Sequence, residues 1–244
     1  MMRAHVTAMR ILILETGEPP APLKARFGGY PAMFERALAP LAARLSFSSA
    51  SAPAGRTPQQ PDGFDGLLVT GSPAGVYDGH AWIGEAERLV RAAAAAGKPC
   101  VGICFGHQLM AQAFGGRVEK SDRGWGVGVH EYSVAAAPDW MDVAPQRLSC
   151  VVSHQDQVVE TPKGARVLAA SDFCPHAALE YAQGPAMSFQ PHPEFSHDFA
   201  EALMLARRGR IPDDRVEEGL RSLKSKTDRD LISRWIADFF LSRR

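Results

Sequence analysis

The chain has 244 residues, of which 45% are hydrophobic, and this is enough for one large packed domain. Its 27 basic and 27 acidic residues cancel, so no overall field would draw it to nucleic acid or to an anionic membrane. No apolar run approaches the length of a bilayer span, and the segment before Ile11 lacks the apolar core of a secretory leader. The four cysteines form no CxxC pair, which argues against a metal site or a disulfide framework and favours the reducing cytoplasm.

Apolar runs and helical patterns alternate along the first part of the chain. Residues 1–9 are predicted to be a loosely ordered leader. Short apolar runs predict buried strands, and apolar residues at helical spacing predict helices. The strands are expected at 10–15, 45–49, 67–70 and 99–103, the helices at 31–41 and 82–96, and the loops at 16–30 and 51–63. This alternation predicts a three-layer α/β domain around a mainly parallel sheet.

The pattern changes after residue 116. Strand-like segments are predicted at 117–120, 126–134, 147–152, 167–171, 178–182 and 186–189, and we expect them to be a small antiparallel or mixed addition to the same sheet. Three helices are predicted at 198–208, 213–223 and 228–240. We therefore predict one domain over 10–195, with a helical C-terminal extension, 196–244, packed on it.

Cys104 lies between an apolar run and a stretch with helical character, with Gly102 and Gly106 on either side. Glycines at a strand-to-helix junction permit a tight, strained turn that holds the side chain exposed for attack. The first NH groups of the following helix favour the thiolate form of such a cysteine. The pattern predicts a nucleophile.

His192 and Glu194 follow another apolar run, in the segment Gln190-Pro191-His192-Pro193-Glu194. A histidine after a buried strand is expected at the carboxyl edge of the sheet, where open α/β folds bind their ligands. The prolines on either side restrict its backbone, and Glu194 can reach the far side of the ring. A thiolate, an imidazole and an orienting carboxylate together are the requirement for nucleophilic hydrolysis.

These motifs resemble those of the class I (triad) glutamine amidotransferases, and in particular the glutaminase domain of GMP synthase. The family pattern GxCxGxQ appears at Gly102, Cys104, Gly106 and Gln108, and QxHPE at Gln190, His192, Pro193 and Glu194. Three shorter matches are the segments 70–73 (TGSP), 115–118 (GGRV) and 153–156 (SHQD). The resemblance covers about residues 10–195, and it implies a flavodoxin-like α/β fold and hydrolysis of the side-chain amide of glutamine through a γ-glutamyl thioester.

The resemblance also implies a role for individual residues. Cys104 is the nucleophile, His192 the base and then the acid, and Glu194 the carboxylate that orients it. Backbone NH groups of Ser72 and Phe105 form the oxyanion hole. The positions that match the family's substrate-binding residues are Gly71, Gln108, Ser153, His154 and Gln155.

Other interpretations stay open at this point. The same triad could cleave a γ-glutamyl peptide or conjugate, and the fold could serve as a non-catalytic binding or regulatory module. His107 and His154 are more readily read as structural histidines than as catalytic ones. The predicted partners are glutamine or a γ-glutamyl compound, and a separate ammonia-accepting synthetase subunit, because the residues after Glu194 are too few for a nucleotide-binding domain. No cofactor is implied.

Overall fold

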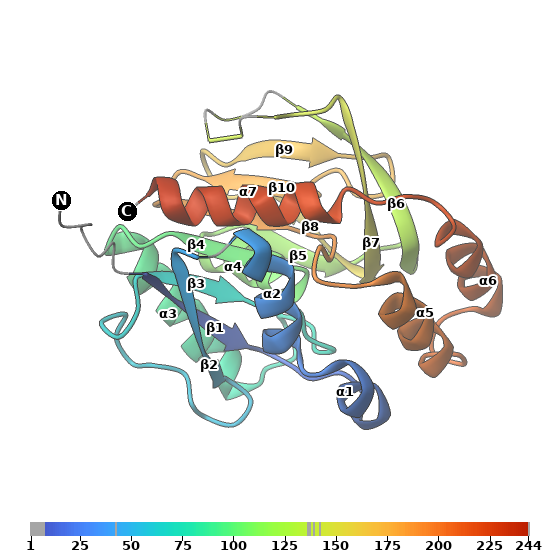
Figure 1. Cartoon of the computed structure of the whole chain (residues 1–244), viewed down its shortest axis with the longest axis horizontal. Coiled ribbons are helices and arrows are strands. Elements are labelled where there is room, and N and C mark those ends of the chain that lie inside the picture. Colours follow the sequence, from blue (N-terminus) through green and yellow to red (C-terminus); the bar gives the residue numbers. More distant parts are fainter. Residues whose placement is uncertain (1–7, 42, 136–137, 139, 142, 244) are drawn as a thin grey trace.

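The computed structural model describes residues 8–41, 43–135, 138, 140–141 and 143–243. A nine-stranded sheet in the order β2-β1-β3-β4-β11-β10-β9-β6-β7 runs through the molecule (Figure 1). The first five strands in that order are parallel, and the remaining four are antiparallel to their neighbours. The chain therefore has the three-layer α/β fold with a mixed sheet that the sequence predicts.

The parallel half contains short, buried strands. Its members are β1 (Met9–Glu15), β2 (Leu45–Ser51), β3 (Gly66–Val69), β4 (Cys100–Ile103) and β11 (Ala186–Phe189). All residues of β3, β4 and β11 are buried, as expected for strands covered on both faces. Because β3, β4 and β11 are neighbours and run the same way, the loops that follow them meet at one edge of the sheet.

The antiparallel half is larger than the small addition that the sequence predicts. It consists of β6 (Gly126–Val134), β7 (Arg147–His154), β9 (Arg166–Ala170) and β10 (Ala178–Tyr181). The segment at 117–120 was expected in the same sheet, and this is wrong. That segment, β5 (Arg117–Lys120), pairs instead with β8 (Asp156–Glu160) in a separate two-stranded sheet. The sequence pattern does not separate β8 from β7, because only Gln155 lies between them.

Helices cover both faces of the parallel strands. On one face α3 (Ala81–Ala95) and α4 (Phe105–Ala113) pack on the sheet through a core that includes Leu89, Phe105 and Leu109. On the other face α2 (Tyr30–Leu38) lies beside α7 (Arg229–Ser242), which crosses the centre of the view in Figure 1. The loop expected at 16–30 contains a further short helix, α1 (Ala21–Phe27), for which its prolines gave no helical pattern.

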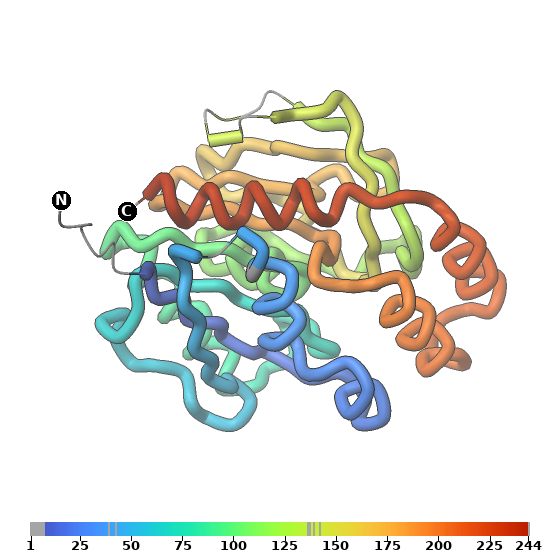
Figure 2. Tube along the Cα trace, in the orientation of Figure 1, coloured from blue at the N-terminus to red at the C-terminus, as the bar shows by residue number. Residues whose placement is uncertain are grey.

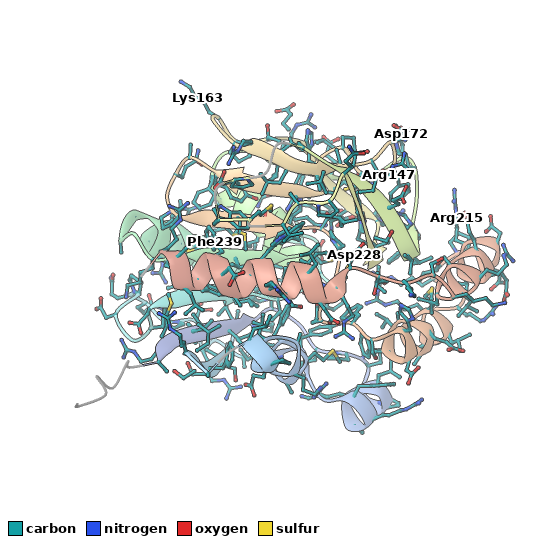
Figure 3. The ribbon with its side chains drawn as sticks, turned by 45° about the horizontal axis from the view of Figure 1, so that its top comes forward. Arg147, Lys163, Asp172, Arg215, Asp228 and Phe239 are labelled. Atoms are coloured by element: carbon teal, nitrogen blue, oxygen red, sulfur yellow. The ribbon has the colours of Figure 1, made fainter. Side chains whose placement is uncertain are left out.

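The C-terminal helices α5 (His197–Ala206), α6 (Asp213–Ser222) and α7 lie against both halves of the sheet. Figure 2 shows α5 and α6 at one end of the molecule, from where the chain returns along α7. Asp228, labelled where α7 begins in Figure 3, accepts a hydrogen bond from the Ser149 NH of β7 (2.7 Å). Phe239, labelled on the same helix, packs edge-on against Trp140 with ring centroids 5.3 Å apart.

The predicted leader falls largely on residues 1–7, which lie outside the described residues, and β1 begins at Met9. Among the helices of the described residues, none is long and apolar enough to cross a membrane.

Candidate active site

Three loops meet at the carboxyl edge of the parallel strands. Gly71 and Ser72 follow β3, Cys104 follows β4, and His192 follows β11. Strand β11 pairs with β4 so that Phe189 lies opposite Ile103, and the Cys104 NH donates to the Phe189 carbonyl (2.8 Å). The sheet order thus brings together two motifs that are far apart in the sequence.

Cys104 has an unusual backbone conformation, with φ 54° and ψ −103°. It is the one non-glycine residue with positive φ in the part of the chain that the structure describes. Such a conformation costs on the order of 1–3 kcal/mol and persists where its surroundings enforce it, frequently at functional sites. Cys104 is also the N-cap of α4, so the positive end of that helix lies at the residue.

The flanking glycines act through close packing, whereas the cysteine itself carries the backbone strain. A Cβ at Gly102 would lie 2.4 Å from the Gly106 carbonyl oxygen, and a Cβ at Gly106 would lie 2.3 Å from the Val69 carbonyl oxygen. Neither glycine has a positive φ. Both are needed because α4 approaches β3 and β4 too closely for any side chain.

His192 is held on three sides. Its Nδ1 donates to Oε1 of Glu194 (2.7 Å), and its backbone NH donates to the Val151 carbonyl of β7 (2.8 Å). The Phe195 ring stacks on the imidazole at 3.9 Å between centroids and 6° between planes. A Cβ at Gly71 would lie 3.0 Å from Cε1 of His192, so the glycine leaves room for the ring. The ring orientation is therefore fixed by packing as well as by Glu194.

Cys104 and His192 interact directly. Burial lowers the pKa of His192, but the Glu194 carboxylate, the charge of Cys104 and hydrogen bonds to both residues outweigh it and raise that pKa to about 10. The hydrogen bond to Cys104 places the thiol within reach of the ring, and because Nδ1 faces Glu194, Nε2 is the nitrogen left for the sulfur. At neutral pH the imidazole is thus protonated and able to donate toward the sulfur.

The Cys104 side chain is only 5% exposed, so the expectation of an exposed nucleophile is wrong. Packing of α4 against the sheet encloses the residue, and access runs through a cavity of about 160 Å³. Cys104, Gln108, Ser153 and Arg207 are among the residues that line this cavity. A second, much smaller cavity of about 10 Å³ lies between Cys104 and His192.

The residues predicted to form the oxyanion hole lie beside Cys104. Ser72 lines both cavities and Phe105 is the first residue of α4. In the described part of the chain, neither NH donates a hydrogen bond to another backbone group. The loop carrying Ser72 is fixed by Thr16, whose hydroxyl donates to the carbonyls of Thr70 (2.9 Å) and Gly71 (3.1 Å).

The predicted substrate-binding residues lie around the larger cavity, except Gly71, which lines the smaller one. Nε2 of Gln108 donates to the Asp156 carbonyl (2.8 Å) and to Oε1 of Gln190 (3.1 Å), which fixes its side chain. Nδ1 of His154 donates to the same Asp156 carbonyl (3.1 Å). Gln155, which stands where the family motif has glycine, has no positive φ, so its backbone carries no strain of that kind.

His107 is a structural histidine. It is fully buried, and its Nδ1 lies 2.7 Å from the Ser188 hydroxyl, which also bonds the Tyr181 hydroxyl (2.7 Å). Burial lowers the pKa of His107 to about 3, so the ring is neutral. It points into the core between α4 and β11 and faces neither cavity.

Sequence reasoning missed several charged residues at the larger cavity. Lys120 comes from β5, Asp78 from the loop before α3, and Arg207 and Arg210 from the segment after α5. The Arg210 guanidinium lies over the Trp125 ring at 5.5 Å from its centroid. Nothing in the sequence separates these residues from the many exposed charges of the chain. No group of three or more His, Cys, Asp or Glu side chains suited to a metal ion occurs among the described residues.

The geometry is that of an α/β protein with a cysteine–histidine pair at the carboxyl edge of its sheet. The family model for class-I glutamine amidotransferases matches residues 27–210, well over half of the chain. The chain belongs to the class-I glutamine amidotransferase family.

Relatives of known description resemble parts of the chain. A glutamine-hydrolysing GMP synthase subunit of Archaeoglobus fulgidus is 35% identical over 135 residues, covering 54% of this chain and 68% of that protein. The glutamine-hydrolysing GMP synthase of Thermus thermophilus is 32% identical over 180 residues, covering 68% of this chain and 33% of the longer protein. The match thus spans about a third of the Thermus enzyme.

Two solved structures share the fold. A glutamine amidotransferase from Thermotoga maritima superposes with a TM-score of 0.76 at 16% identity, covering 96% of this chain and 97% of that one. A glutamine amidotransferase from Methylobacillus flagellatus gives a TM-score of 0.72 at 21% identity, covering 97% and 94%. At these identities the likeness shows the fold alone.

Proposed function

We propose that the protein hydrolyses the side-chain amide of glutamine to glutamate and ammonia, using Cys104, His192 and Glu194. One observation carries the proposal: a cysteine in a strained turn within hydrogen-bonding reach of a histidine that a buried glutamate orients. Membership of the class-I glutamine amidotransferase family supports the choice of glutamine over other amides.

The chemistry follows from the protonation state of the pair. The Cys104 thiolate attacks the amide carbon, and the protonated His192 gives its proton to the nitrogen as the carbon–nitrogen bond breaks and ammonia leaves. The γ-glutamyl thioester remains on the sulfur. His192 then takes a proton from water, and the hydroxide attacks the thioester. The carbon–sulfur bond breaks, releasing glutamate and restoring the thiolate and the protonated histidine.

In this proposal the NH groups of Ser72 and Phe105 bind the oxyanion of both tetrahedral intermediates. Removing one such donor typically costs about 3 kcal/mol of transition-state stabilisation. The amino-acid end of the substrate lies against Gln108, Ser153, His154 and Gln155 in the larger cavity, and Gly71 keeps the space between Cys104 and His192 open.

We infer further that ammonia passes to a separate synthetase subunit. The Archaeoglobus relative and one from Methanocaldococcus jannaschii are each named as a single subunit of GMP synthase, which supports an acceptor on another chain. We also propose that residues 10–195 form the catalytic domain, with 196–244 as a helical extension of it. Four free, buried thiols support a reducing, cytoplasmic location.

Ammonia release from L-glutamine by the purified chain, with and without cell extract, tests the proposal. We expect turnover by the wild type, and loss of turnover with an unchanged circular dichroism spectrum in Cys104→Ser and Cys104→Ala. A panel of γ-glutamyl peptides in the same assay distinguishes the alternative substrates. Absence of ammonia release under all of these conditions would favour a non-catalytic module.

Labelling gives an independent test. A diazo-ketone glutamine analogue should modify Cys104 and spare the other cysteines, because burial raises the pKa of Cys100 and of Cys174 to about 12 and also raises that of Cys150. Those thiols stay protonated and enclosed. Modification of any of them in the folded protein would contradict the assignment of the nucleophile.

A further inference from the structure

Arg207, the C-cap residue of α5, brings a positive charge into the candidate active site. Its Nη1 donates to the Ser153 hydroxyl at the end of β7 (2.7 Å). It lines both cavities, and in both it is accompanied by Cys104 and Ser153. A residue from beyond the predicted domain at 10–195 therefore forms part of the wall around the sulfur.

This guanidinium has no carboxylate partner. Within the described ranges, no ion pair involves Arg207. Burial lowers its pKa, as does the charge of Arg210. The adjacent Arg208 differs, because it is exposed and pairs with Asp213 (3.2 Å) and Glu217. A partly desolvated cation without a counter-ion is unfavourable, and an anion bound in the cavity would relieve that cost.

The place of Arg207 selects the anion. A γ-glutamyl substrate that presents its acyl carbon to Cys104 extends its α-carbon, with amino and carboxylate groups, along the cavity of about 160 Å³. Ser153 and Gln155 border that cavity, and Arg207 is hydrogen-bonded to the first of them. Arginine is well suited to a carboxylate because its planar fork can donate two parallel hydrogen bonds.

We propose that Arg207 binds the α-carboxylate of the γ-glutamyl substrate, so that the C-terminal extension completes the substrate site. The inference rests on the proposed function, since it takes the acyl group of the substrate to lie at Cys104. It defines the substrate class as γ-glutamyl compounds with a free α-carboxylate, and it excludes those in which that group is an amide.

Kinetics with two substrates test the assignment. L-Glutamine and its α-amide, glutaminamide, differ only in the group that Arg207 would bind. We expect the wild type to prefer glutamine strongly. In Arg207→Met, KM for glutamine should rise on the order of 10²-fold, as when one partner of a buried charge pair is removed, with a much smaller change in kcat. The preference over glutaminamide should then disappear, and Arg207→Lys should restore part of it.

Arg208→Met is the matched control, because it removes the same charge from the next residue and leaves the cavity unchanged. Its KM for glutamine should equal that of the wild type. If Arg207→Met lowers turnover of glutamine and glutaminamide by the same factor, Arg207 does not recognise the carboxylate and the proposal is wrong.

Alkylation of Cys104 by iodoacetamide, which has no carboxylate, separates the remaining cases without needing turnover. We expect glutamine to protect the wild-type sulfur far better than glutaminamide does, and this difference to vanish in Arg207→Met. Equal protection in the wild type would overturn the assignment. A changed pH profile of alkylation in Arg207→Met would also overturn it, because the guanidinium would then act on the thiolate. Selective protection without ammonia release would refute the proposed hydrolysis and leave carboxylate recognition intact.

Discussion

Gly106 is the position at which a single methyl group should damage the site most directly. An added Cβ would lie 2.3 Å from the Val69 carbonyl oxygen and 2.9 Å from its carbonyl carbon. These are backbone atoms of β3 and cannot rotate away, so α4 and β3 must separate by roughly 1 Å. Overpacking of this kind costs about 1–3 kcal/mol of folding stability.

The same shift acts on the site from two sides. The Gly106 NH donates to the Thr70 carbonyl (3.1 Å), which precedes the loop carrying Ser72, and Cys104 stands two residues before Gly106. Moving α4 therefore displaces the sulfur and the predicted oxyanion donors relative to each other. A misplacement of about 1 Å can lower the rate on the order of 10²-fold.

The assay compares Gly106→Ala with Gly84→Ala. Gly84 lies in α3, is exposed, and has nothing within 4 Å of an added Cβ. Replacing such a glycine stabilises a helix by about 1 kcal/mol, so Tm should rise by about 2–4 °C with unchanged kcat/KM for glutamine. In Gly106→Ala, Tm should fall by roughly 2–10 °C and kcat/KM by on the order of 10²-fold. A Gly106→Ala variant that keeps the wild-type Tm and kcat/KM would refute the close-packing argument.

Three further predictions concern strain, pH and burial. Because Cys104 carries the positive φ, inactive Cys104→Gly should unfold about 2–4 °C above inactive Cys104→Ala in calorimetry, and equal Tm values would mean that the turn is unstrained. Activity should persist until the pH nears about 10, where His192 loses its proton. In Glu194→Gln this basic limb should move toward neutral pH and kcat should fall on the order of 10²-fold, and an unmoved limb in the pH–rate profile would argue against the pairing. Burial lowers the pKa of His107 and of His154 to about 3, so the unfolded chain binds more protons below pH 6.5 and stability falls as the pH drops. Each should contribute a loss of about 2 kcal/mol at pH 5 relative to pH 7, measured by urea unfolding, and His107→Asn should reduce that loss.

Much of the parallel half was predictable because its strands are short, apolar and separated by clear helical patterns. The strand at 186–189 and the strand at 126–134 have the predicted bounds, and β4 and α4 flank Cys104 as expected. The separate sheet of β5 and β8 was not predictable, because alternation shows that a segment is a strand and does not show which strand it pairs with.

The site divides in the same way. Cys104, His192 and Glu194 were identifiable because glycines and prolines around them restrict the backbone. Arg207 was not, because its role depends on how α5 packs against β7, and a basic residue at the end of a helix is ordinary. The burial of Cys104 was also missed, since the sequence shows the turn and not the walls that other segments build around it.

The register between β11 and β4 is what turns two separate motifs into a pair. Four consecutive residue pairs connect Ala186–Phe189 with Cys100–Ile103, and the Cys104 NH continues the ladder to the Phe189 carbonyl. Side chains of a strand alternate between faces, so a slip of one residue would send every side chain of β11 to the opposite face. It would also move His192 by about 3.3 Å along the strand direction, more than the length of its hydrogen bond to Glu194. Substitutions at Met187 or Phe189, which are fully buried on β11 and do not line either cavity, should therefore impair the Cys104–His192 interaction through register alone.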